Sequence, residues 1–284
     1  MAAVAAGFDG DAWPAWPASP SFFPKDGFGA PAEARPLAVV ALPVRVTVVR
    51  AMAAMMPPGD TVGGMESTAF IRELEAFKAE RLAPILAAGA TSMGDLQAET
   101  SADPTRLLQV ALANEINVSE LAALWMPSTA ELDVKLAFAR QAGDEASHFQ
   151  LVADRLAALG FDLAAFTPPA ANPMFAYLRG LTTTVERVAA GLFTLESLAH
   201  GVNQGFMAFC AARGDHETVR IYDAYIQPDE LAHQQLGQRL LARHAITDEQ
   251  QALAWTTVGR LLELATATRA SAAARLGTAC IPGC

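Results

Sequence analysis

Two short stretches, "DEASH" (144–148) and "DELAH" (229–233), repeat the pattern Asp-Glu-x-x-His within one chain, 85 residues apart. Glu and His three positions apart project from one face of a helix, so each copy can offer a carboxylate oxygen and an imidazole nitrogen to a cation. The same offset pairs further identical residues: Gln150 with Gln235, Leu151 with Leu236 and Leu156 with Leu241. The repeat therefore indicates two related helix pairs, each of which carries half of a site.

A glutamate in an apolar helical segment precedes each motif. Glu115 lies 30 residues before Glu145 in "LQVALANEINVSELAAL", and Glu196 lies 34 residues before Glu230 in "AAGLFTLESLAHGV". A helix–turn–helix connection would place each of these glutamates opposite its motif. Because an isolated glutamate is costly to bury among apolar residues, two bound cations would remove that cost.

The composition favours a helical protein and argues against several partners. The chain has 284 residues, is 52% hydrophobic and carries a net charge of −10. Its many Ala and Leu residues favour helices, and an acidic chain is not expected to bind nucleic acid or an anionic membrane surface. Three cysteines are too few for a disulfide framework, so a cytoplasmic location is expected.

Neither a membrane-spanning helix nor a secretory signal is expected. The apolar run 37–56 is interrupted by Pro43, Arg45 and Arg50, which are poorly tolerated in a spanning helix. Residues 1–20 lack a basic segment followed by a continuous apolar one.

Helix start and stop signals predict six helices joined mostly by short loops. The expected ranges are 66–89, 103–126, 128–160, 174–213, 215–244 and 247–277. A capping box from Ser128 to Glu131 is expected to start the third helix. Pro228 in the fifth either kinks the helix and aims Glu230 or marks a boundary near Ile226.

Three segments are expected along the chain. Residues 1–64 are rich in Pro and Gly and are expected to form an irregular N-terminal extension, residues 65–277 a helical bundle, and residues 278–284 a loose tail. Alternative starts at Met52, Met55, Met56 and Met65 leave open whether the extension belongs to the protein.

The four glutamates and two histidines give one Glu and one Glu-x-x-His per half, and this set resembles the ligands of ferritin-like di-iron and di-manganese carboxylate proteins. The resemblance covers about residues 103–244. The Asp before each motif Glu is similar to that of the hydroxylase subunits of bacterial di-iron monooxygenases and of ring-epoxidising enzymes that act on aromatic CoA thioesters. The resemblance implies an all-α fold, a ferritin-like antiparallel four-helix bundle with extra flanking helices.

The resemblance also implies a role for each candidate ligand. One metal ion would be bound by Glu115, Glu145 and His148, and the other by Glu196, Glu230 and His233. Glu145 and Glu230 would bridge the two ions, whereas Glu115 and Glu196 would be terminal and free to shift. Carboxylates with one imidazole per ion suit two iron ions, with manganese or a mixed manganese–iron pair as alternatives.

Several neighbours of the ligands are candidates for supporting roles. Asp144 and Asp229 are expected to accept hydrogen bonds from the metal-binding histidines of the opposite halves, His233 and His148. His200 is either an additional ligand or a hydrogen-bonded neighbour. Five residues one or two turns from the ligands either line a substrate cavity or belong to the core: Phe138, Gln141, Leu192, Phe193 and Tyr222.

The expected activity is that of a non-haem di-metal oxidoreductase, an oxidase or monooxygenase that uses dioxygen to oxidise a small organic substrate. Such an enzyme would need an electron donor, a reductase or ferredoxin, and a homodimer is one assembly that the sequence allows. The alternative is a ferroxidase or iron-storage protein of the bacterioferritin–rubrerythrin type. The length of the chain and the lack of Cys-x-x-Cys pairs favour the oxygenase. A metal-free scaffold is a third hypothesis, which the intact ligand set disfavours.

Overall fold

The computed structural model describes residues 65–98, 104–167, 172–276, 278 and 281–283. These residues belong to one unit, Pro58–Cys284. Within the described ranges all regular secondary structure is helical, which confirms the predicted all-α class. The predicted extension over residues 1–64 lies outside the described residues.

Four of the described helices have 25 residues or more, and shorter helices and turns lie between them. The α-helices are α2 (Ser67–Ala98), α3 (Pro104–Ser128), α4 (Leu132–Ala158), α5 (Pro173–Arg179), α6 (Thr184–Val188), α7 (Glu196–Ala212), α8 (His216–Ile221), α9 (Gln227–His244) and α10 (Asp248–Leu276). A 3₁₀ turn, η1, covers Leu163–Ala165, and two π-helical turns cover Ala189–Leu195 (η2) and Tyr222–Ile226 (η3).

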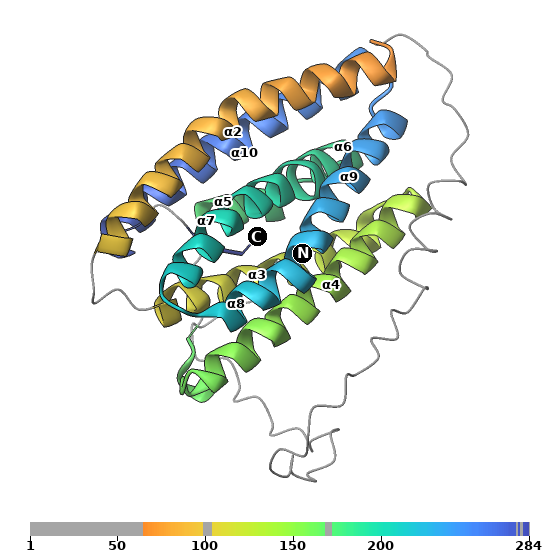
Figure 1. Ribbon diagram of the computed structural model, residues 1–284. Helices are drawn as coiled ribbons and strands as arrows, with labels where there is room; N and C mark the ends of the chain where they lie inside the picture. Colours follow the sequence, from red (N-terminus) through yellow and green to blue (C-terminus); the bar gives the residue numbers. More distant parts are fainter. Residues whose placement is uncertain (1–64, 99–103, 168–171, 277, 279–280, 284) are drawn as a thin grey trace, which may run out of the picture. The chain divides into compact units, whose positions relative to one another are not determined.

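The helices pack in pairs that are visible in Figure 1. Helices α3 and α4 lie side by side and are joined by residues 129–131, so they run in opposite directions. Helix α9 contacts α7, η2 and α4, and therefore links the two halves of the sequence repeat. Helices α2 and α10 lie side by side. Helix α10 contacts η2, and α2 contacts α7, which follows η2.

The site residues lie on the buried stripes of their helices. In α3 the buried positions Leu108, Leu112, Glu115, Val118, Ala122 and Trp125 recur every three or four residues. In α4 the corresponding stripe is Val134, Phe138, Gln141, Glu145, His148, Val152 and Leu156. Three- and four-residue spacing places all of these side chains on one helix face. The apolar residues at both ends of each stripe pack in the core, so the polar residues between them, Glu115 in α3 and Gln141, Glu145 and His148 in α4, are buried as well.

The start of α4 differs from the prediction. The expected capping box from Ser128 to Glu131 is wrong, because α3 continues through Ser128 and α4 begins at Leu132. The hydroxyls of Ser128 and Thr129 donate to the carbonyl of Trp125 and so satisfy the end of α3 instead. Glu131, the residue before α4, makes no capping hydrogen bond and accepts one from the Thr184 hydroxyl.

Two other predicted helix boundaries are also wrong. The helix expected at 66–89 continues to Ala98, and its extension buries Met93. The helix expected at 174–213 is interrupted at Gly180, which ends α5. Thr183 and Glu186 then form a reciprocal capping box that starts α6, so the chain restarts a helix where a continuous one was expected.

Each π-helical turn comes directly before a helix that carries a candidate ligand. Glu196 is the first residue of α7 and follows η2, and Glu230 lies in the first turn of α9 and follows η3. The boundary predicted near Ile226 is present as a change of helix type, because η3 ends at Ile226 and α9 begins at Gln227 while the backbone stays helical. Pro228 is the second residue of α9, two residues after the end of η3. A π turn is one of the few settings in which a helix accommodates a local change in its hydrogen-bond ladder.

The end of the chain is not loose where it is described. Ile281, Pro282 and Gly283 are buried, and the carbonyl of Pro282 accepts a hydrogen bond from the Asn114 amide, 3.1 Å away. This contradicts the predicted loose tail for those residues, because a terminal segment stays ordered when its backbone is hydrogen-bonded to the fold. Among the helices of the described part of the chain, none is long and apolar enough to cross a membrane.

Candidate metal centre

Six side chains from four helices converge in the interior, as the repeat predicted. They form two groups, one of Glu115, Glu145, His148 and Glu230, the other of Glu145, Glu196, Glu230 and His233. In each group one potential ligand atom per residue lies within 4.8 Å of the others. Glu145 and Glu230 belong to both groups, which is the position expected of residues that bridge two ions.

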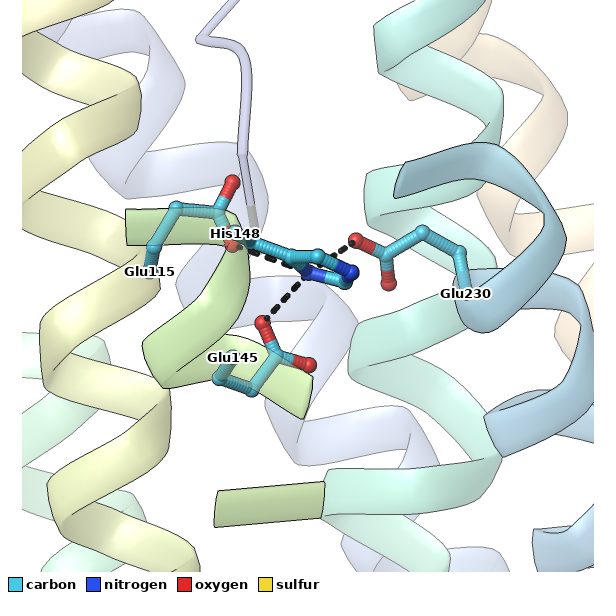
Figure 2. A group of neighbouring side chains, drawn as sticks. All are labelled: Glu115, Glu145, His148 and Glu230. Carbon is cyan, nitrogen blue, oxygen red and sulfur yellow. Dashed lines mark hydrogen bonds and ion pairs between the residues drawn. The ribbon is translucent and has the colours of Figure 1, made fainter. Parts of the chain in front are cut away.

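The first group surrounds one ring nitrogen of His148 (Figure 2). His148 Nδ1 lies 3.2 Å from Glu145 Oε2, 3.6 Å from Glu115 Oε2 and 4.0 Å from Glu230 Oε1. Glu115 approaches from α3, Glu145 and His148 come from α4, and Glu230 approaches from α9. These separations leave room for a cation between the donors, since metal–ligand bonds of about 2 Å place donor atoms roughly 3 Å apart.

The second group repeats this arrangement around His233. Its Nδ1 lies 3.4 Å from Glu145 Oε1 and 3.7 Å from Glu196 Oε1. Glu145 therefore turns one oxygen toward each histidine, because its Oε2 faces His148. A carboxylate with its two oxygens directed to two sites can bind two cations at once.

The other nitrogen of each histidine contacts an aspartate of the opposite half. His148 Nε2 lies 3.4 Å from Asp229 Oδ2, and His233 Nε2 lies 3.2 Å from Asp144 Oδ2. This is the crossed pairing expected from the sequence. An aspartate that accepts a hydrogen bond from Nε2–H favours the tautomer whose Nδ1 lone pair is directed at the centre, which is the form that can bind a cation.

The two terminal glutamates lie in different surroundings. Gln141 donates a hydrogen bond from Nε2 to Glu196 Oε1. In contrast, neither oxygen of Glu115 has a hydrogen-bond partner among the described residues, and His233 Nδ1 also has none there. Buried polar atoms without hydrogen-bond partners are costly, so their presence within this cluster favours a bound group that would satisfy them.

Burial and mutual proximity shift the pKa values of the cluster. Burial raises the pKa of Glu115 to about 8. Burial, Glu196 and Glu145 raise the pKa of Glu230 well above its usual value. Burial would also raise the pKa of Glu145, but His148 and His233 outweigh it and lower that pKa. The pKa values of both histidines are raised because the surrounding carboxylates outweigh the effect of burial.

These shifts predict that the metal-free protein loses stability as the pH rises from about 5 to 8. Glu115 keeps its proton in the folded state up to a pKa of about 8, whereas the unfolded chain loses it near 4.5. The folded state then binds more protons than the unfolded state, so the free energy of unfolding falls as the pH rises through this window. The histidines act in the same direction above pH 6.5.

The measurement is urea unfolding of chelator-treated protein at several pH values. The depressed pKa of Glu145 acts only below 4.5, outside this window. Glu115→Gln is the matched variant, because a neutral amide cannot take up the proton and should flatten the slope. A stability that stayed constant or increased between pH 5 and 8 would contradict the prediction.

The donor set fits divalent metal ions. Four carboxylates and two imidazoles, all buried, supply hard oxygen and borderline nitrogen donors without a thiolate. Four ionised carboxylates would balance the charge of two divalent cations, and without cations such a cluster could be buried only with some of its protons retained. The cluster can therefore hold metal.

The other candidate residues lie around the centre without joining it. His200 is in neither group; its Nε2 lies 3.5 Å from the Gln204 amide, and its carbonyl accepts a hydrogen bond from Gln227. Of the two roles predicted for His200, additional ligand or hydrogen-bonded neighbour, this arrangement corresponds to the second. The five candidate pocket residues are all buried: Phe138, Gln141, Leu192, Phe193 and Tyr222. Of these, Gln141 contacts a member of the cluster directly.

Lys78 is a supporting residue that the sequence analysis did not identify. It is 1% exposed, and its Nζ donates to the carbonyl of Phe193 at 3.1 Å and to the hydroxyl of Ser197 at 2.7 Å. It also pairs with Glu75 and lies 3.7 Å from the centre of the Phe193 ring. Because Ser197 follows Glu196, Lys78 anchors the π-helical turn that presents this glutamate. The sequence contains a signal that could have identified this residue. Lys78 is the charged member of a series whose other members are apolar and which recurs every three or four residues: Phe70, Leu74, Lys78, Leu82 and Ile85.

The chain belongs to the family described as proteins of unknown function, DUF455, whose model matches residues 105–274. This range contains all six residues of the two groups. Neither the curated proteins nor the solved structures that were searched include a match to the chain.

Proposed function

We propose that this DUF455 chain is a non-haem di-metal oxidoreductase with a ferritin-like four-helix core, which uses dioxygen to oxidise a small organic substrate. The observation that carries the proposal is the sharing of Glu145 and Glu230 by two adjacent groups of ligands. A site for one ion would need only one group, whereas two groups with common carboxylates suit a pair of ions. Iron is the preferred metal, with manganese as the alternative, because the donors are carboxylates and imidazoles.

The protein's own contribution is to position the ligands and to exclude water. All six side chains are at most 2% exposed, so reactive species at the centre would be shielded from solvent. Asp144 and Asp229 orient the two imidazoles, and Gln141 restrains Glu196. When bound, the metal pair would supply the redox chemistry with dioxygen. Electrons would come from an external donor such as a reductase or a ferredoxin.

The difference between the terminal glutamates supports a reaction rather than a purely structural metal site. Gln141 donates a hydrogen bond to Glu196, whereas Glu115 accepts none among the described residues and is held there by its ion pair with His148, at 3.6 Å. A carboxylate without hydrogen bonds can change its coordination at low cost and so open a position for an incoming molecule. We therefore place the labile side of the centre at Glu115.

The test is anaerobic loading with ferrous iron followed by exposure to oxygen. The expected result is about two iron ions per chain, as in two-metal sites generally, and consumption of oxygen with a visible absorption change. The matched control is the chain with Glu145→Ala treated in the same way. Failure of the wild-type chain to retain metal would overturn the proposal.

The same experiment separates the oxygenase from a ferroxidase. An iron-storage protein would oxidise many ferrous ions per chain and retain them as an oxide, and it would form a large hollow assembly on gel filtration. The proposed enzyme stops at its two bound ions unless an electron donor and a substrate are added. Continued uptake of iron beyond the two sites would favour storage.

A further inference from the structure

The C-terminal segment Ile281–Gly283, called the tail below, is built into the wall of the metal centre. The backbone N–H of Gly283 donates to Asn203 Oδ1 at 2.9 Å, and the carbonyl of Pro282 accepts from Asn114 at 3.1 Å. Asn203 belongs to α7 and Asn114 to α3, the helices that carry the two terminal glutamates. The tail is thus hydrogen-bonded to both halves of the repeat.

Gly283 lies beside Glu115, a member of the metal centre. A Cβ atom at this position would lie 3.0 Å from Glu115 Oε1 and 3.1 Å from the Cα and carbonyl oxygen of Ala111. The backbone of Gly283 has a φ of 81°, in the left-handed region that other residues rarely adopt. Both the space and the conformation therefore require glycine.

The tail also limits the free volume on this side. Ile281 lines a cavity of about 20 Å³ together with Asn114 and Leu195, which are the residues that precede Glu115 and Glu196. A cavity of this size holds about one water molecule. Glu115 Oε2 faces His148 Nδ1, whereas Oε1 lies beside Gly283, so the tail limits the space into which Oε1 can move.

We propose that the tail, through Gly283, is a positioning element for Glu115 and thereby controls the affinity and the accessibility of the metal ion that Glu115 binds. The inference rests on the proposed metal centre. It predicts that the two metal positions respond differently to changes in the tail. Gly283 lies so close to Glu115 that an added Cβ atom would come within 3.0 Å of its Oε1, whereas Glu196 accepts a hydrogen bond from Gln141.

The test compares Gly283→Ala, a chain ending at residue 277, and the wild type by manganese titration. Both changes should weaken one of the two sites at least about tenfold and leave the other unchanged, so that their binding curves resemble that of Glu115→Ala and not that of Glu196→Ala. Release of the weakened ion to a chelator should accelerate by a similar factor. The matched control is Gly94→Ala, where a new Cβ would meet no atom within 4 Å.

The outcomes separate this inference from the proposed function. Two unchanged sites in both variants, or an equal weakening of both sites, would overturn the role of the tail while leaving the metal centre intact. Absence of metal binding by the wild type would instead refute the proposed function. Amide exchange in the metal-free chain tests the tail independently of metal binding. Removal of the tail should increase exchange around residues 111–115 of α3 without changing exchange in α8, for which no contact with the tail is found among the described residues. Unchanged exchange in α3 would reject the role of the tail.

Discussion

Glu145→Ala is expected to abolish binding of both metal ions, whereas Glu115→Ala should remove only one. The difference follows from the geometry, because Glu145 belongs to both groups of ligands and turns one oxygen toward each histidine. Loss of an outer-sphere partner of a metal site already costs about 10- to 100-fold in affinity, so loss of a bridging ligand should cost more than about 100-fold at both positions. Metal analysis after anaerobic loading and desalting measures the number of ions retained.

The control for this experiment is Glu80→Ala, which removes an exposed glutamate from α2, a helix that supplies no ligand. It should retain both ions. Circular dichroism should show that Glu145→Ala remains helical, since removing a buried carboxylate also removes the cost of burying it. A Glu145→Ala chain that kept two ions would contradict the assignment of the shared ligand.

The composition of the centre could be predicted from the sequence because it depends on local periodicity. The doubled Asp-Glu-x-x-His pattern fixes the face of each helix on which Glu145, His148, Glu230 and His233 lie. The apolar stripes around Glu115 and Glu196 then require those glutamates to enter the same core. The crossed pairing of Asp144 and Asp229 also follows, since each aspartate directly precedes the glutamate of its motif and so lies beside the opposite histidine when the halves face each other.

Other features of the centre depend on tertiary contacts that no local pattern encodes. The π-helical turns η2 and η3 replace ordinary helix at positions where the sequence gives helical periodicity alone. Lys78 and Phe193 are 115 residues apart, and Asn203 and Gly283 are 80 apart, so nothing in their own segments pairs them. The tail was predicted to be loose because its short sequence has no helical or strand signal, yet its backbone groups are satisfied by side chains of α3 and α7.

Gly237 in α9 is the position where a single methyl group is expected to be most damaging to the fold. A Cβ atom there would lie 2.7 Å from the backbone nitrogen of Phe193 and 2.8 Å from the carbonyl carbon of Leu192, both in η2. Backbone atoms cannot rotate away as a side chain can, so α9 and η2 would have to separate. Overpacking of this kind costs up to about 3 kcal/mol, which corresponds to a fall of about 6–12 °C in melting temperature for a unit of this size.

The same substitution should also disturb the metal centre, because Gly237 lies one turn after His233 and η2 leads directly into Glu196. Separation of α9 from η2 would move apart the two residues whose atoms are 3.7 Å from each other in the second group. Gly94→Ala is the matched control; it meets no atom within 4 Å and should be neutral or stabilise α2 by up to about 1 kcal/mol. Thermal unfolding of the two metal-free variants measures the effect on the fold, and manganese titration measures the effect on the site. If Gly237→Ala melted at the wild-type temperature, the close approach of α9 to η2 would not be what holds Glu196 and His233 at their present separation.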